Sequence, residues 1–145
     1  MQQISILLPV LTLAFWTFII FAIMAPARFY FLRIKHPQTA AHTKDLKGLL
    51  PPWTERVGDN YNHLFEQPVA FYVIAISIAI TNNIEPLMIQ LAWAYVALRV
   101  LHSIVQITFN FVPLRFTLFV TSWLILGYMI AVSYTHLRAH ETDIN

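Results

Sequence analysis

The sequence predicts an all-α fold, an integral membrane four-helix bundle. Of its 145 residues, 58% are hydrophobic and only 11% are charged, a balance too apolar for an ordinary soluble domain. The apolar residues are also gathered into four stretches, and a helix that crosses a bilayer needs about 20 of them. We therefore expect one membrane domain.

The four predicted spans follow one another along the chain. The first covers residues 4–25 and is uncharged, and the second covers residues 64–80 with Glu66 near its start. The third covers residues 86–109 and the fourth residues 114–131. No lysine or arginine occurs in residues 1–5, so the first span lacks the basic start of a secretory signal peptide and is expected to be retained.

The connections between the spans carry their own signals. The second helix is expected to begin near Trp53 as an amphipathic segment through Asn62, and Pro68 is expected to kink or locally unwind it. The turn TNNIEP at residues 81–86 ends this helix, and the third helix emerges at Asn110. A short link then places Arg115 at the start of the fourth helix.

Charge predicts the orientation of the bundle. The loop between the first two spans is rich in basic residues, namely Arg28, Arg33, Lys35, Lys44, Lys47 and Arg56, against Asp45 and Glu55. By the positive-inside rule the first and third loops are cytoplasmic, and both termini lie across the membrane. Orientation explains the net charge of +2 without a nucleic-acid partner, which we do not expect.

Several functional classes lack the residues that they need. The chain has no cysteine, which excludes disulfides, thiolate metal sites and a cysteine nucleophile. Its histidines have no close pair with ligand-like spacing, so no metal is expected. The three glycines form no phosphate-cradling loop.

The C-terminal residues differ abruptly from the apolar pattern. The segment VSYTHLRAHET, residues 132–142, resembles a sequencing adapter translated in one frame. We therefore predict that residues 1–131 are the membrane domain and that residues 132–145 are a non-native tail. A native polar tail is the alternative.

Polar residues recur on one face of the predicted third helix. Arg99, His102, Gln106 and Asn110 are spaced by three, four and four residues. A charge at the bilayer centre is costly, so Arg99 is expected to face the bundle interior and to pair with Glu66. Such residues can simply fix helix packing, and this structural role is the alternative to a ligand site.

Other polar and aromatic residues have further interpretations. Asp59, Asn62 or His63, and Glu66 share a helical face that could meet the polar face of the third helix. Arg115 lies where a helix start offers unpaired N–H groups, a favourable place for a thiolate or carboxylate. Four aromatic residues are expected to face lipid or the membrane interface: Trp93, Tyr95, Phe109 and Trp123.

Two segments of the sequence are RVGDNYNHLFEQPVAFY (residues 56–72) and WAYVALRVLHSIVQITFNFVPLRF (residues 93–116). Both resemble the MAPEG family, the membrane-associated proteins in eicosanoid and glutathione metabolism. The most specific part is Arg99-x-x-His102 followed by Pro113-x-Arg115. The resemblance implies a four-helix protomer in a homotrimer, with glutathione bound between subunits near the cytoplasmic side. The segments look most like those of bacterial members, which implies a bacterial inner membrane as the location.

The resemblance also implies roles for individual residues. Glu66, Arg99 and His102 match positions that help to hold glutathione, and Arg115 matches the arginine proposed to stabilise its thiolate. Two positions depart from the family pattern. His63 stands where an asparagine is common, with Asn62 one place earlier, and Gln106 stands where the prostaglandin synthase has a tyrosine.

Two functions follow from this pattern. The first is a membrane-bound glutathione-dependent transferase or peroxidase-like enzyme that takes lipophilic electrophiles from the bilayer. Its catalytic residue is Arg115, and its expected cofactor-binding residues are Glu66, Arg99, His102, Asn62, His63 and Gln106. The second is a noncatalytic membrane scaffold or lipid-binding trimer of the same fold, which the departures at His63 and Gln106 favour.

Overall fold

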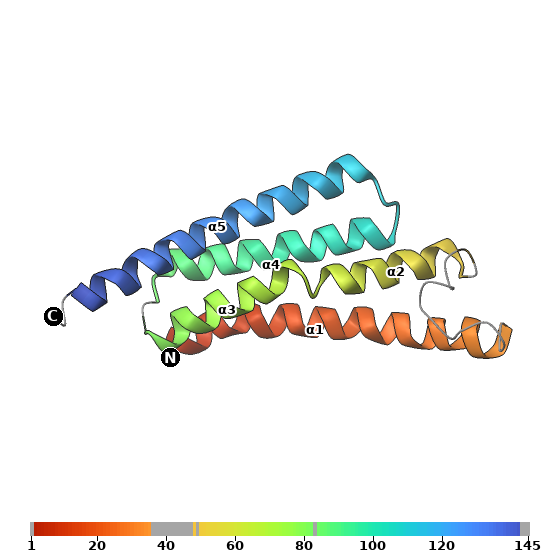
Figure 1. Ribbon diagram of the computed structural model, residues 1–145, viewed down its shortest axis with the longest axis horizontal. Coiled ribbons are helices and arrows are strands. Elements are labelled where there is room, and N and C mark those ends of the chain that lie inside the picture. Colours follow the sequence, from red (N-terminus) through yellow and green to blue (C-terminus); the bar gives the residue numbers. More distant parts are fainter. Residues whose placement is uncertain (1, 36–47, 49, 83, 143–145) are drawn as a thin grey trace.

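The computed structural model describes residues 2–35, 48, 50–82 and 84–142. In this part of the chain the regular structure is helical, and four segments are long and apolar enough to cross a membrane: Ser5–Arg33, Pro52–Ile80, Pro86–Ile107 and Val112–His136. The helices lie side by side along the long axis of the molecule (Figure 1). The predicted four-span membrane protein is confirmed.

The bundle has two distinct ends (Figure 1). The N-terminus, the α3–α4 connection and the C-terminus lie toward one end, which we call the terminal end. The last residues of η1, the start of α2 and the turn between α4 and α5 lie toward the other end, which we call the loop end. Consecutive spans therefore run in opposite directions.

The first span is longer than the sequence predicted. Helix α1 covers Gln2–Phe29 and continues as a π-helix, η1, over Tyr30–Lys35. Pro9 and Pro26 both lie inside α1. The predicted end at residue 25, next to a proline, is therefore wrong, and the basic segment begins on a helix.

The second span is broken, as the proline predicted. Helix α2 covers Pro52–His63 and α3 covers Gln67–Ile80, and the helix is interrupted between them (Figure 1). Pro68 is the second residue of α3, where its missing N–H costs no helical hydrogen bond. The interruption thus falls at residues 64–66, just before the proline, and it changes the direction in which Glu66 and Gln67 project.

The last two spans meet at a tight connection. Helix α4 covers Pro86–Ile107, and α5 covers Val112–Thr142. Asn110 has a left-handed backbone conformation with φ of 50°, which asparagine tolerates better than most residues. Asn110 is therefore in the turn after α4 and has left the helical face on which the spacing placed it.

The core combines apolar packing with a few aromatic contacts. Helix α4 packs against α1, α2 and α5, while α3 packs against α1 and α5. Tyr95 is fully buried and stacks on Phe71 with ring centroids 4.4 Å apart. The expectation that Tyr95 faces lipid is therefore wrong, whereas Trp93, Phe109 and Trp123 are exposed on the protomer as expected.

Helix α5 continues into the segment that resembles an adapter. His136 Nε2 lies 3.2 Å from Glu85 Oε1 at the terminal end. A helix can extend into a sequence of any origin, so this continuation does not test the predicted boundary at residue 131. We assign no role to the His136–Glu85 contact.

Candidate functional site

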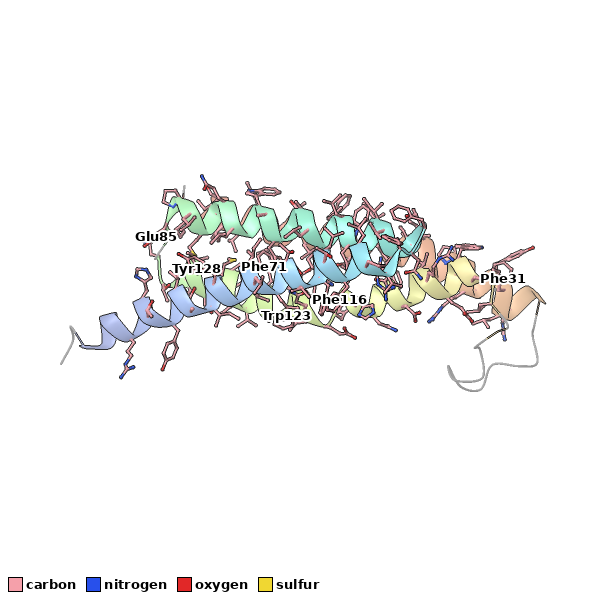
Figure 2. The ribbon with its side chains drawn as sticks, turned by 90° about the horizontal axis from the view of Figure 1, so that it is seen from above. Phe31, Phe71, Glu85, Phe116, Trp123 and Tyr128 are labelled. Atoms are coloured by element: carbon pink, nitrogen blue, oxygen red, sulfur yellow. The ribbon has the colours of Figure 1, made fainter. Side chains whose placement is uncertain are left out.

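A polar cavity opens at the loop end, between the break in the second span, α4 and the start of α5. Its volume is about 190 Å³, and its lining residues are His63, His102, Val112, Arg115, Phe116 and Phe119. Phe116 is exposed and lies on the same helix as Trp123 and Tyr128, which Figure 2 labels further along α5. The cavity therefore combines basic side chains with aromatic walls.

Arg115 is held in this cavity by the turn that precedes α5. Its Nη1 donates a hydrogen bond to Asn110 Oδ1 at 2.7 Å, and the left-handed conformation of Asn110 brings that side chain within reach. The backbone N–H of Arg115 donates to the carbonyl of Phe111. Because the Asn110 amide is neutral, it positions the guanidinium without neutralising its charge.

His63 and Glu66 form a pair at the helix break. His63 Nδ1 lies 2.8 Å from Glu66 Oε2, and their side chains are 40% and 63% exposed on the protomer. The His63 and His102 rings stand edge to face with centroids 6.4 Å apart. One wall of the cavity thus carries two imidazoles, of which one is held by a carboxylate.

Arg99 lies behind the cavity and is almost fully buried, at 1% exposure. Its Nη1 donates to Gln67 Oε1 at 2.9 Å and its Nη2 donates to the backbone carbonyl of His63 at 3.1 Å. Gln67 Oε1 also accepts from Ser122 Oγ at 3.1 Å. These contacts, the Arg99 network, connect α3, α4 and α5.

The predicted Arg99–Glu66 ion pair is wrong for the protomer. Within the described part of the chain, the Arg99 guanidinium bonds to Gln67 and to the His63 carbonyl, while the Glu66 carboxylate bonds to His63. The physical reason is the interruption at residues 64–66, which directs Gln67 rather than Glu66 toward α4. The interior position of Arg99 is confirmed.

The remaining predicted residues fall in different places. His102 and Gln106 are buried, and each has a polar atom without a hydrogen-bond partner among the described residues, His102 Nδ1 and Gln106 Oε1. Asn62 is exposed on α2 and does not line the cavity. The structure therefore brings together His63, His102 and Arg115, with Arg99 behind them.

A second buried polar cluster was not predicted. Ser103 Oγ accepts hydrogen bonds from Trp16 Nε1, at 2.9 Å, and from Asn60 Nδ2. This Ser103 node links α1, α2 and α4. A single serine next to His102 does not by itself predict a polar cluster. Ser103 and Asn60 lie on the faces where α4 meets α2, and polar residues on facing helices can be expected to share a hydrogen bond.

The cavity offers features that suit an anionic thiol compound. Arg115 supplies a cation whose partner is a neutral amide, and the imidazoles of His63 and His102 line the same cavity. The described residues contain no group of three His, Cys, Asp or Glu side chains that could hold a metal ion. The donor set therefore fits carboxylate or thiolate groups.

The four membrane-capable helices define the class of protein, a multi-pass integral membrane protein. The model of the MAPEG family matches residues 6–135, which is most of the sequence. The chain belongs to the MAPEG family. Comparisons with curated proteins and with solved structures gave no match.

Proposed function

We propose that the protein is a membrane-bound glutathione-dependent transferase or peroxidase-like enzyme that acts on lipophilic electrophiles. The observation that carries this proposal is the convergence of Arg115, His63 and His102 on one open cavity. Arg115 is the proposed catalytic residue because a fixed guanidinium near a helix N-terminus favours a thiolate over a thiol. Glutathione, when bound, supplies that thiol.

The other residues are proposed to bind and orient the tripeptide. His102 lines the cavity, Arg99 lies behind it, and Gln106 is buried further along α4. Phe116 and Phe119 line the cavity, and Phe116 is exposed on the protomer surface. A lipophilic electrophile could therefore enter from the bilayer along these rings.

We further propose that neighbouring copies complete the site in a homotrimer. A cavity of about 190 Å³ is smaller than the roughly 300–1,000 Å³ usual for ligand sites, so one protomer encloses only part of a tripeptide. Glu66 and Asn62 are exposed within a membrane-capable span. Because exposure of charge to lipid is costly, a neighbouring subunit that covers this face explains both features and places Glu66 and Asn62 at the shared site.

The proposed location is a bacterial inner membrane with the first and third loops in the cytoplasm. Arg28, Arg33, Arg56 and Arg115 all belong to the loop end. Their basic side chains suit the headgroups of anionic lipids and the cytoplasmic side of a membrane. Glutathione would then enter the polar cavity from the cytoplasm.

Isothermal titration of glutathione into the full chain in mild detergent tests this function. We expect saturable binding that Arg99→Leu abolishes and Arg33→Ala, a matched loss of one exposed arginine, does not. Since replacement of the buried Arg99 can also affect folding, a second variant blocks the cavity from an exposed position. This variant is Val112→Trp, and Leu114→Trp is its control. Absence of binding to the folded oligomer would contradict the proposal.

One observation favours the second candidate, a noncatalytic membrane scaffold or lipid-binding trimer. Two nitrogens of the Arg99 guanidinium are bonded by the protein itself, to Gln67 and the His63 carbonyl. Such a network can serve packing alone. Titration with anionic lipid in place of glutathione separates the two functions, since a scaffold would bind lipid and leave glutathione free.

A further inference from the structure

The His63–Glu66 pair is a feature that the proposed role of Arg115 does not use. A guanidinium can stabilise a thiolate once it has formed, but it does not accept a proton at neutral pH because arginine is always charged. Formation of the thiolate from a neutral thiol therefore needs a separate proton acceptor. The cavity contains two imidazoles that could serve, His63 and His102.

We propose that His63, oriented by Glu66, is the general base that removes the thiol proton in the polar cavity. This inference rests on the proposed function and adds a catalytic residue to it. It follows from the contact of 2.8 Å between His63 Nδ1 and Glu66 Oε2 and from the position of His63 in the lining of the cavity that holds Arg115.

The Glu66 contact determines which nitrogen of His63 is basic. An ionised carboxylate only accepts hydrogen bonds, so the hydrogen lies on His63 Nδ1 and the lone pair lies on Nε2. The same carboxylate then stabilises the imidazolium that forms when Nε2 takes a proton. Histidine and carboxylate pairs act in this way when the carboxylate fixes the tautomer and orientation of the ring.

His102 is less suited to the same step. Its ring is buried, whereas the side chain of His63 is 40% exposed and lies at the surface of the break. Nδ1 of His102 has no hydrogen-bond partner among the described residues, so no contact there fixes its tautomer.

The thiol S–H bond breaks, the proton passes to His63 Nε2, and the electron pair stays on sulfur as a thiolate beside the Arg115 guanidinium. The thiolate then forms a bond to the electrophile, whose leaving group departs with its electron pair. The His63 imidazolium can return the proton to that group, which regenerates the base.

Four charged or titratable residues surround His63. Glu66 contacts its Nδ1, His102 faces its ring from α4, Arg115 shares the cavity from α5, and Arg99 holds its backbone carbonyl. Since the Arg99 bond is to the backbone, replacement of the His63 side chain leaves that acceptor in place. His63→Ala is therefore a suitable test variant.

The experiment measures thiolate formation directly, through the ultraviolet absorbance of glutathione mixed with the full chain in a stopped-flow instrument across neutral pH. We expect His63→Ala to slow thiolate formation about 100-fold, to change its pH profile and to retain glutathione binding. Added imidazole should restore part of the rate. Glu66→Gln should slow the step less, while Asp59→Asn, which removes an exposed carboxylate from α2, should leave it unchanged.

The outcomes separate this inference from the function on which it rests. If wild-type protein binds glutathione and forms the thiolate, but His63→Ala does so at the same rate and with the same pH profile, the role of His63 is overturned and that of Arg115 remains. If wild-type protein does not bind glutathione, the proposed function fails and this inference fails with it.

Discussion

The bundle contains two polar regions that differ in how their hydrogen bonds are completed. In the closed interior, the Arg99 network and the Ser103 node bond mainly to the protein's own side chains. In the open cavity, Arg115 and His63 each have one side-chain partner and line empty space. The difference separates a group that supports the cavity from behind, such as Arg99, from groups that line it, such as Arg115 and His63.

The largest effect on activity is expected from a change to Arg115 in the open cavity. Arg115→Ala should lower the rate of glutathione transfer to a lipophilic electrophile by about 100- to 1,000-fold, the usual cost of losing one group that stabilises a developing anion. The oligomer should stay assembled because the hydrogen bond of the Arg115 side chain is local, to Asn110 in the turn before α5. Turnover assays and size-exclusion chromatography measure the two effects, and unchanged turnover would reject the assigned role.

The next largest effect, on stability, is expected from a change to the Arg99 network in the closed interior. Gln67→Leu removes the acceptor shared by Arg99 and Ser122 and should lower the free energy of unfolding in detergent by about 2 kcal/mol, because a hydrogen bond to a charged group is lost. Gln67→Glu keeps an acceptor and is the matched control. Thermal unfolding followed by circular dichroism provides the measurement; equal stability of the two variants would mean that Gln67 does not support Arg99.

Ser103→Ala tests the other part of the closed interior. It leaves Trp16 Nε1 and Asn60 Nδ2 without their acceptor, and we expect a loss of about 1 kcal/mol, since interhelical hydrogen bonds in membranes average about 0.6 kcal/mol each. Ser103→Thr retains the hydroxyl and serves for comparison. Glutathione affinity should change little in either variant, whereas a large loss of affinity would assign the Ser103 node to the ligand site.

The smallest effect is expected where the turn positions a cavity residue. Asn110→Gly permits the left-handed backbone conformation but removes the acceptor for Arg115, so turnover should fall by no more than about tenfold, corresponding to 1.4 kcal/mol. Asn110→Asp retains the acceptor and should preserve the position of Arg115. Steady-state kinetics on both variants check this, and full activity of Asn110→Gly would show that Arg115 needs no such support.

Much of the fold was predictable from local properties. Four apolar stretches of sufficient length determine four spans, because unsatisfied backbone groups force each one to be helical in lipid. Pro68 predicted the interruption of the second span. The spacing of Arg99, His102 and Gln106 predicted the buried polar face of α4, since helical periodicity alone places these residues together.

The sequence by itself therefore determined the membrane fold, the family and the side of α4 that is polar. Only the tertiary structure decided which polar groups meet. The unwound residues 64–66 gave Arg99 a neutral amide partner in Gln67 and left Glu66 with His63, and the left-handed Asn110 placed its side chain on Arg115. Helical spacing is reliable only while the helix is continuous, and here a break of three residues was enough to change the partners of Arg99 and Glu66.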